Sequence, residues 1–168
     1  MARSPMAPLL DTGDLFPEFR LSLLDGRRLS LPTDLTQPFN VVLVNRGAFC
    51  AYCCAQLRAF QTGLPKLTAA GVGVVSFSTD ALDDAQKLAR EHGLEFPVGF
   101  GVSVDTAAER LGVYYEPVRG DRPSHLQSAG FIVRGSGTIL CAVYSSGAIG
   151  RLVWQDVLGF VEYVKAHE

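Results

Sequence analysis

Hydrophobic and polar residues alternate near the N-terminus, and further along the chain short runs are wholly apolar. The alternation predicts a β-hairpin around the turn residues Asp25 and Gly26. The apolar runs have the length of strands that are buried on both faces of a sheet. We expect strands at residues 19–23, 28–31, 41–44, 72–77, 96–100, 131–133 and 138–144.

Helical spacing of apolar residues occupies four of the segments between these strands. We expect helices from about Cys50 toward Gly63, from Leu82 to His92, from Thr106 to Leu111 and from about Leu152 to Lys165. Pro65 should close or kink the first helix. Thr79 or Asp80 should cap the second helix and Asp105 the third. Residues 114–127 contain two prolines and predict a long loop.

The order of these elements predicts an α/β fold. Strands and helices alternate in the first half, which favours parallel pairing, and two adjacent strands near the end favour antiparallel pairing. We therefore expect a mixed central sheet flanked by helices on both faces, with an N-terminal hairpin. A length of 168 residues fits a single domain over 1–168, in which 1–14 form a loose lead-in.

Composition narrows the class of protein. The net charge of −2 shows no basic excess, so we expect neither nucleic acid nor an anionic membrane as a partner. No apolar stretch approaches the roughly 18 residues that a membrane span needs. Four cysteines are too few for a disulfide scaffold, and three of them lie within five positions. This clustering predicts thiol chemistry in a reducing compartment, and hence a cytoplasmic protein.

The cysteine cluster lies where a buried strand leads into a helix. The segment Cys50-Ala51-Tyr52-Cys53 follows the strand at 41–44 after a short loop. The first amide groups of a helix lack internal partners, and the helix dipole favours negative charge there. A thiolate at that position is stabilised, and the thiolate is the reactive form of cysteine. Cys50 should therefore have the lowest pKa of the cluster.

The other cysteines differ in the helix face that they occupy. Residues advance by about 100° along a helix, so Cys53 falls on the apolar side and Cys54 on the more polar side. Either could be the partner of Cys50. Cys141 lies in an alternating strand and is expected to be a packed core residue. The histidines His92, His125 and His167 are isolated in sequence from one another and from the cysteines, so we expect no metal site. Folding could still bring His125 near the cysteines.

The stretch Arg46-Gly47-Ala48-Phe49-Cys50-Ala51-Tyr52-Cys53 resembles the R-G-x-x-C-P-x-C signature of a peroxiredoxin-like branch of the alkyl hydroperoxide reductase / thiol-specific antioxidant family. Residues 15–19, 96–97 and 131–139 are similar to other segments of that family. The resemblance implies a thioredoxin-like, peroxiredoxin-type fold, with Cys50 as peroxidatic nucleophile and Cys53 as resolving cysteine. It also implies a small hydroperoxide substrate, no bound cofactor, and an external thiol reductant such as thioredoxin or glutathione. It is compatible with a homodimer.

Three positions depart from the family pattern. Gly47 stands where the family has Thr or Ser, Ala51 replaces a proline, and Gln127-Ser128-Ala129-Gly130 lacks the family arginine. Arg46 is therefore the best candidate for the cation beside Cys50.

Several further residues and functions are candidates beside these. Arg58 and Arg134 are secondary candidates for the cation, and Tyr52 is expected to shield the sulfur. Two alternatives to a peroxidase stay open, namely a thiol–disulfide oxidoreductase of thioredoxin type and a non-enzymatic redox sensor. The missing hydroxyl and arginine favour the first of these.

Overall fold

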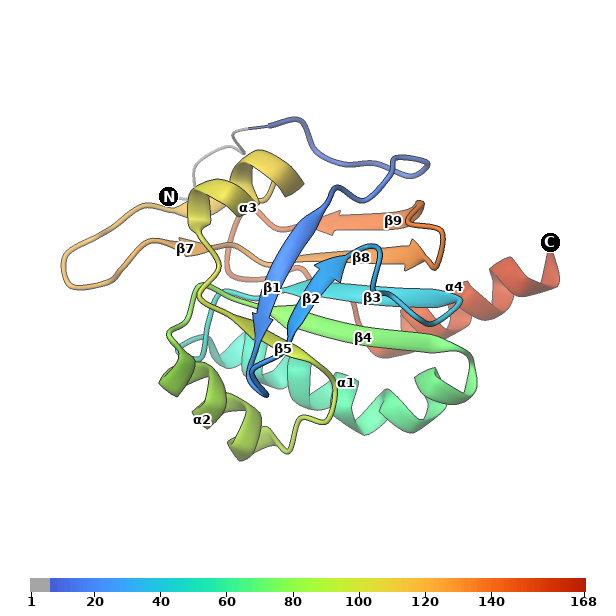
Figure 1. The fold of residues 1–168 in the computed structure, drawn as a ribbon, viewed down its shortest axis with the longest axis horizontal. Coiled ribbons are helices and arrows are strands. Elements are labelled where there is room, and N and C mark those ends of the chain that lie inside the picture. Colours follow the sequence, from blue (N-terminus) through green and yellow to red (C-terminus); the bar gives the residue numbers. More distant parts are fainter. Residues whose placement is uncertain (1–6) are drawn as a thin grey trace.

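The computed structural model of the chain describes residues 7–168, and a seven-stranded mixed sheet forms its centre (Figure 1). The order of strands across the sheet is β2-β1-β5-β4-β3-β8-β9. These strands are β1 (Phe19–Leu23), β2 (Arg28–Leu31), β3 (Phe39–Val44), β4 (Val72–Phe77), β5 (Val98–Phe100), β8 (Ala129–Arg134) and β9 (Ile139–Tyr144). The helices are α1 (Ala51–Ala69), α2 (Leu82–His92), α3 (Val104–Leu111) and α4 (Trp154–Ala166).

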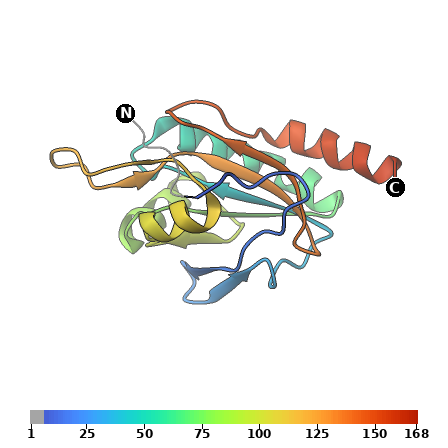
Figure 2. The ribbon, with the colours of Figure 1, turned by 90° about the horizontal axis from the view of Figure 1, so that it is seen from above.

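Helices cover both faces of this sheet, as the sequence predicts. Figure 2 shows α1 and α4 on one face and α3 on the other. Alternate residues of β3 point into two separate hydrophobic clusters, because successive side chains of a strand face opposite ways. Leu43 packs in the cluster that holds Phe60 of α1, and Val44 packs in the cluster that holds Leu111 of α3. The predicted α/β class, mixed sheet and N-terminal hairpin β1-β2 are confirmed.

Strand β3 lies at the centre of the sheet and leads directly to the cysteines. It pairs in parallel with β4 and antiparallel with β8, and all six of its residues are buried. Its last residue is Val44, and α1 begins at Ala51. A continuous buried strand therefore fixes the starting point of the loop that carries Cys50.

The first helix is longer than the sequence predicts, because α1 continues through Pro65 to Ala69. Proline lacks the N–H that would bond to the preceding turn, so its presence within a helix must be offset elsewhere. Leu67 is fully buried in the cluster beneath α1, and this burial anchors the last turns.

The predicted helix caps were also wrong. The N-cap of α2 is Ala81, without a side-chain bond, because the Asp80 carboxylate accepts from the Ala48 amide instead. In α3 the cap is Ser103, whose hydroxyl accepts from the Thr106 amide, so Asp105 lies within the first turn.

Two segments that the sequence predicts to be irregular are tied to the body. Within residues 114–127, β6 (Tyr115–Glu116) pairs with β7 (His125–Leu126) in a short hairpin. The described part of the lead-in is also bonded, since the Gly13 amide donates to the Ile139 carbonyl at 2.9 Å. The remainder of the predicted lead-in, residues 1–6, lies outside the described residues.

Helix α4 approaches α1 closely because α1 has a glycine at the contact. Trp154, the first residue of α4, lies against Gly63, and a Cβ atom added there would overlap its indole ring. The Lys66 ammonium lies 5.6 Å from the centre of the same ring. The small residue therefore determines how near the start of α4 lies to α1.

We expect Gly63→Ala to lower the free energy of unfolding by about 1–3 kcal/mol, since the added methyl group must displace a large packed ring. Chemical denaturation followed by circular dichroism measures this change. The matched control is Gly159→Ala, because nothing lies within 4 Å of a Cβ atom at this helical glycine. There we expect a gain of roughly 0.5–1 kcal/mol from helix propensity. Equal effects of the two substitutions would contradict the packing argument.

Candidate active site

The loop between β3 and α1 is fixed by hydrogen bonds from a buried asparagine and a half-buried aspartate. The Asn45 amide nitrogen donates to the Phe77 carbonyl at 3.0 Å, and its oxygen accepts from the Gly47 amide at 3.0 Å. The Asp80 carboxylate accepts from the Ala48 amide at 2.8 Å. Burial raises the pKa of Asp80 above its ordinary value, although the Ala48 amide and the Ser78 hydroxyl act in the opposite direction. These contacts hold residues 45–48 in one conformation.

Gly47 occupies a position that no other residue type fits without strain. Its φ of +123° lies in the region that favours glycine, and an added Cβ atom would lie 2.5 Å from the Asp80 carboxylate. The departure from the Thr or Ser of the resembled family therefore has a structural cause. A side chain at position 47 would collide with the carboxylate that fixes the loop.

Cys50 and Cys53 are buried side by side at the start of α1. Cys50 is the N-cap residue and is 4% exposed, whereas Cys53 is 1% exposed. Burial tends to raise the pKa of the Cys50 thiol. The Cys53 amide and thiol and the Arg46 guanidinium act in the opposite direction and hold the pKa of Cys50 below the ordinary value of 9.0. The predicted ranking of Cys50 as the most acidic cysteine is consistent with this environment.

Arg46 contacts both sulfur atoms through different groups. Its Nη1 donates to Cys50 Sγ at 3.6 Å, and its backbone amide donates to Cys53 Sγ at 3.2 Å. Its Nη2 lies 3.4 Å from His125 Nε2. The Arg46 guanidinium also lies 5.5 Å from the centre of the Phe49 ring. The residue that the sequence selected as the main cation is thus beside the predicted nucleophile.

His125 orients Arg46 from the β6-β7 hairpin. Its Nδ1 lies 3.3 Å from the Pro123 carbonyl, so we assign the proton to Nδ1 and leave Nε2 as an acceptor for Arg46. Burial lowers the pKa of His125, and the nearby Arg46 charge lowers it further, although the Pro123 carbonyl raises it. The neutral imidazole can therefore accept from the guanidinium. Sequence spacing gives no indication of this contact, because 79 residues separate the two positions.

A second arginine, Arg151, reaches the same two sulfurs from the loop before α4. Its Nη2 lies 3.2 Å from Cys53 Sγ and 3.6 Å from Cys50 Sγ. No sequence pattern pointed to Arg151 as a site residue. Its place follows only from the pairing of β9 with β8 and of β8 with β3, which brings the end of β9 to the same edge of the sheet as the end of β3.

Among the secondary candidates, Tyr52 contacts a residue of the site, whereas Arg58 and Arg134 make no contact with the two sulfurs. Tyr52 is 58% exposed, and its ring centre lies 5.8 Å from the Arg151 guanidinium. Arg58 is exposed on α1, and no hydrogen bond or ion pair of its side chain is seen within residues 7–168. Arg134 lies at the opposite end of the sheet, next to Phe39, and pairs with Glu168. The geometry therefore supports no role for Arg58 or Arg134 beside Cys50.

Cys54 and Cys141 both have surroundings that disfavour a thiolate. The Cys54 thiol donates to the Ala48 carbonyl at 3.4 Å, and burial together with the nearby Cys50 charge raises its pKa. Burial also raises the pKa of Cys141, a half-buried residue of β9 that packs on the α1 and α4 side of the sheet. Of the two possible partners of Cys50, Cys53 is the one that shares its donors.

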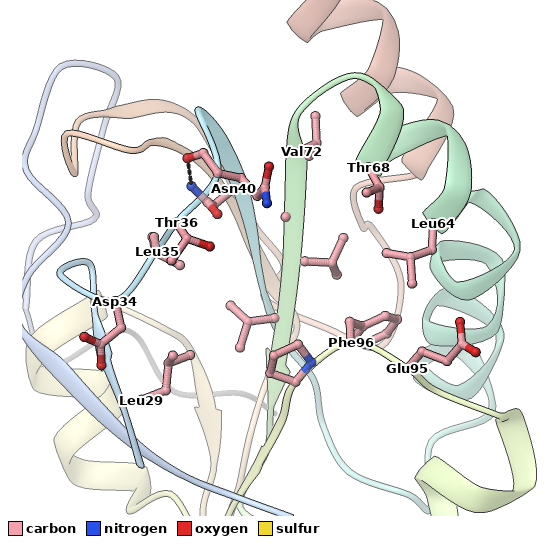
Figure 3. A pocket seen from close by; sticks show the side chains of 15 residues that line it. Leu29, Asp34, Leu35, Thr36, Asn40, Leu64, Thr68, Val72, Glu95 and Phe96 are labelled. Atoms are coloured by element: carbon pink, nitrogen blue, oxygen red, sulfur yellow. Dashed lines mark hydrogen bonds between the residues drawn. The ribbon is translucent and has the colours of Figure 1, made fainter. Parts of the chain in front are cut away.

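The cavities of the molecule do not all lie at the cysteines. One of about 270 Å³ lies at the start of β4, where Leu64 and Thr68 of α1 face Asp34 and Leu35 across the strand (Figure 3). No cysteine, histidine or arginine lines it. A second, of about 300 Å³, is lined by Arg46, Phe49, Asp80, Arg122 and His125 among others. This second cavity gives access to the Arg46 side of the site.

Within residues 7–168, no group of three or more His, Cys, Asp or Glu side chains could hold a metal ion. None of the described helices has the length and hydrophobicity required to cross a bilayer.

We expect Gly47→Ala to destabilise the protein by more than the roughly 1–3 kcal/mol of a strained backbone conformation, because the methyl group also meets Asp80. Thermal or chemical denaturation measures the loss. Gly13→Ala is the matched control, since Gly13 has a φ of +95° with nothing within 4 Å of an added Cβ atom. If both substitutions cost the same, the contact with Asp80 has no energetic weight.

Comparison with known proteins places this geometry in a family. The sequence profile of the AhpC/TSA family matches residues 12–140. No curated protein matches the chain.

Solved structures share the fold at low identity. The chain is similar to the peroxidoxin BcpB from Mycobacterium tuberculosis, with a TM-score of 0.78, 18% identity, and coverage of 92% of this chain and 98% of that one. AhpC from Mycobacterium tuberculosis gives 0.76 and 19%, with 96% of each chain covered. The thiol peroxidase from Chromobacterium violaceum gives 0.74 and 10%, with 96% and 91% covered. The predicted thioredoxin-like, peroxiredoxin-type fold is confirmed, and the chain belongs to the AhpC/TSA family of peroxiredoxin-type thiol peroxidases.

Proposed function

We propose that the chain reduces a hydroperoxide through the thiolate of Cys50. The observation that carries this proposal is the contact between the Arg46 guanidinium and the sulfur of Cys50, at the start of α1. The contact favours the anionic form of the sulfur, which is the nucleophile. The sulfur attacks the distal oxygen of the peroxide, the O–O bond breaks, and Cys50 becomes a sulfenic acid. The leaving oxygen takes a proton and departs as water or an alcohol.

Donors that already contact Cys50 can stabilise the negative charge on the leaving oxygen. Negative charge develops on that oxygen as the O–O bond lengthens, so fixed donors there lower the barrier. Arg46 supplies a cation, and its orientation is set by His125 at 3.4 Å. The amides at the start of α1 add the positive end of the helix dipole. No hydroxyl at position 47 is needed for this arrangement.

In this proposal Cys53 completes the cycle as the resolving cysteine, as expected for the Cys-x-x-Cys branch that the sequence resembles. Its sulfur displaces the oxygen of the Cys50 sulfenic acid, giving a disulfide and water. An external dithiol or glutathione then reduces the disulfide by thiol–disulfide exchange. The clustering of free thiols fits a reducing compartment such as the cytoplasm. A homodimer stays a prediction.

A thiol–disulfide oxidoreductase is the second candidate, because an acidic Cys50 next to a buried Cys53 also suits attack on a disulfide. The two functions differ in the oxidant that Cys50 prefers. Second-order rates of Cys50 oxidation by hydrogen peroxide and by a small disulfide, measured on the same protein, separate them.

We expect Cys50→Ser to abolish peroxide consumption in the presence of a thiol regenerant, since the hydroxyl of serine cannot form the sulfenic acid. Cys54→Ser is the matched control and should keep most of the activity, because burial raises the pKa of Cys54. Peroxide consumption measured at neutral pH gives both values. Activity of Cys50→Ser equal to that of the wild type would remove Cys50 from the mechanism.

We expect one equivalent of peroxide to produce an intrachain disulfide in the wild type, because the two sulfurs share donors on both sides. Intact-mass analysis should show the loss of two hydrogens. In Cys53→Ser the expected product is a Cys50 sulfenic acid that a dimedone reagent traps. The same loss of two hydrogens in Cys53→Ser would show that another cysteine resolves.

A further inference from the structure

Two arginines contact the cysteine pair, and their side chains divide between the two sulfurs. The Arg46 guanidinium reaches Cys50 alone and turns its other nitrogen toward His125. The Arg151 guanidinium lies nearer to Cys53, at 3.2 Å, than to Cys50, at 3.6 Å. Arg151 lies outside residues 12–140, the part of the chain that matches the family.

Cys53 needs such a cation more than Cys50 does. Burial raises the pKa of the Cys53 thiol to about 11, and the Arg46 amide and the Arg151 guanidinium are the groups that act against this rise. A neutral thiol is a poor nucleophile, so resolution requires that Cys53 lose its proton in a nearly dry environment. The amide of Arg46 is a dipole, whereas Arg151 brings a full charge.

The start of α4 is built to bring Arg151 to this place. The Gln56 amide nitrogen, one turn beyond Cys53 in α1, donates to the Leu152 carbonyl at 2.9 Å. Leu152 packs on Gly130 of β8, where an added Cβ atom would lie 2.7 Å from the leucine side chain. On the other side of Arg151, its Nη1 donates to the Ala148 carbonyl at 2.7 Å.

The loop before Arg151 is also held from within. Ser145 is 5% exposed, its amide donates to the Ser128 carbonyl at 2.9 Å, and its hydroxyl contacts the carbonyls of Gly147 and Ile149. Contacts on α1, β8 and this loop therefore fix the backbone on both sides of Arg151.

We propose that Arg151 is the residue that activates Cys53 for the resolving step, an inference that rests on the peroxidase function proposed above. In this step the Cys53 thiol gives up its proton, and its sulfur attacks the sulfur of Cys50 sulfenic acid. An S–S bond forms, the S–O bond breaks, and hydroxide leaves and takes a proton as water. Cys53 is oxidised and the Cys50 sulfur is reduced from sulfenic acid to disulfide, so the electrons balance.

Oxidation of Cys50 itself prepares the second step. In the reduced protein, the negative charge of the Cys50 thiolate raises the pKa of Cys53. The sulfenic acid is neutral, so this repulsion disappears once peroxide has reacted. Arg151, whose Nη2 is within 3.6 Å of both sulfurs, then acts on Cys53 without competition from a neighbouring anion. Formation of the sulfenic acid therefore supplies the electrophilic sulfur for the second step and also removes the negative charge that opposes ionisation of Cys53.

Arg151→Gln tests the proposal through the rates of the two steps. Rapid mixing with hydrogen peroxide, followed by quenching and intact-mass analysis, resolves sulfenic acid formation from disulfide formation. A rise of one unit in the pKa of Cys53 lowers the thiolate fraction at neutral pH by about tenfold. The more basic thiolate reacts about threefold faster, so the net slowing is about threefold per unit. We expect disulfide formation at neutral pH to slow by about three- to tenfold, with its pH midpoint shifted upward. Sulfenic acid formation should slow by a smaller factor.

Two further variants are the controls. Arg46→Gln removes the guanidinium that contacts Cys50 and should therefore slow sulfenic acid formation more than disulfide formation. Arg58→Gln removes an exposed arginine of α1, the helix that carries Cys53, and should leave both rates unchanged. Circular dichroism checks that Arg151→Gln is folded. If it is not, Arg151→Lys replaces it, because lysine keeps the charge, and we expect a smaller slowing of the same step.

The result that overturns the proposal is disulfide formation slowed no more than sulfenic acid formation, or slowed without a change in its pH midpoint. Failure of the proposed function would look different. In that case the wild type itself would not lose two hydrogens after one equivalent of peroxide.

Discussion

The burial of two sulfur atoms at the start of one helix is the constraint on which the rest of the site depends. Burial opposes ionisation of a thiol, and at Cys53 it raises the pKa to about 11. At Cys50 the same opposing effect is outweighed by the Cys53 amide and thiol and by the Arg46 guanidinium. The chemistry of the protein thus depends on how many donors the fold can bring to these sulfurs, and on which sulfur each donor serves.

Three separate parts of the chain provide those donors and the histidine that orients one of them, and the central sheet holds the three parts in place. Strand β3 delivers Arg46 and the cysteines, the β6-β7 hairpin delivers His125, and the loop after β9 delivers Arg151. Each of these segments leaves the same edge of the sheet. Small residues permit the approach, since Gly47 lies against Asp80 and Gly130 lies against Leu152. Gly47, which stands where the resembled family has Thr or Ser, is therefore required by the geometry of the site.

The sequence predicts most of the fold because its signals are local. The strands at 19–23, 28–31 and 72–77 were predicted at their observed bounds, since apolar periodicity and the turn at Asp25-Gly26 act within a few residues. The end of α1 was missed, because the burial of Leu67 against distant residues offsets the proline at 65. The caps of α2 and α3 were missed because Asp80 is engaged by a residue 32 positions away and Ser103 takes the role expected of Asp105.

For the site, the sequence predicted the residues that lie on one continuous segment and gave no role to those that arrive from elsewhere. Cys50, Cys53 and Arg46 lie within eight residues, and a helix start explains their proximity. His125 and Arg151 are 79 and 101 residues from their contacts, and only the strand order brings them near. Arg134, a candidate from sequence, lies at the far end of β8 for the same reason.

The most direct test of this account is a titration of Cys50 itself. In a variant that keeps Cys50 and replaces the other three cysteines by serine, thiolate absorbance followed against pH gives its pKa without the thiol of Cys53. Arg46 and the start of α1 remain, so the account predicts a midpoint below the ordinary value of 9.0, and a rise of that midpoint when Arg46 is replaced by glutamine. A midpoint at or above 9.0, unchanged by that replacement, would contradict it.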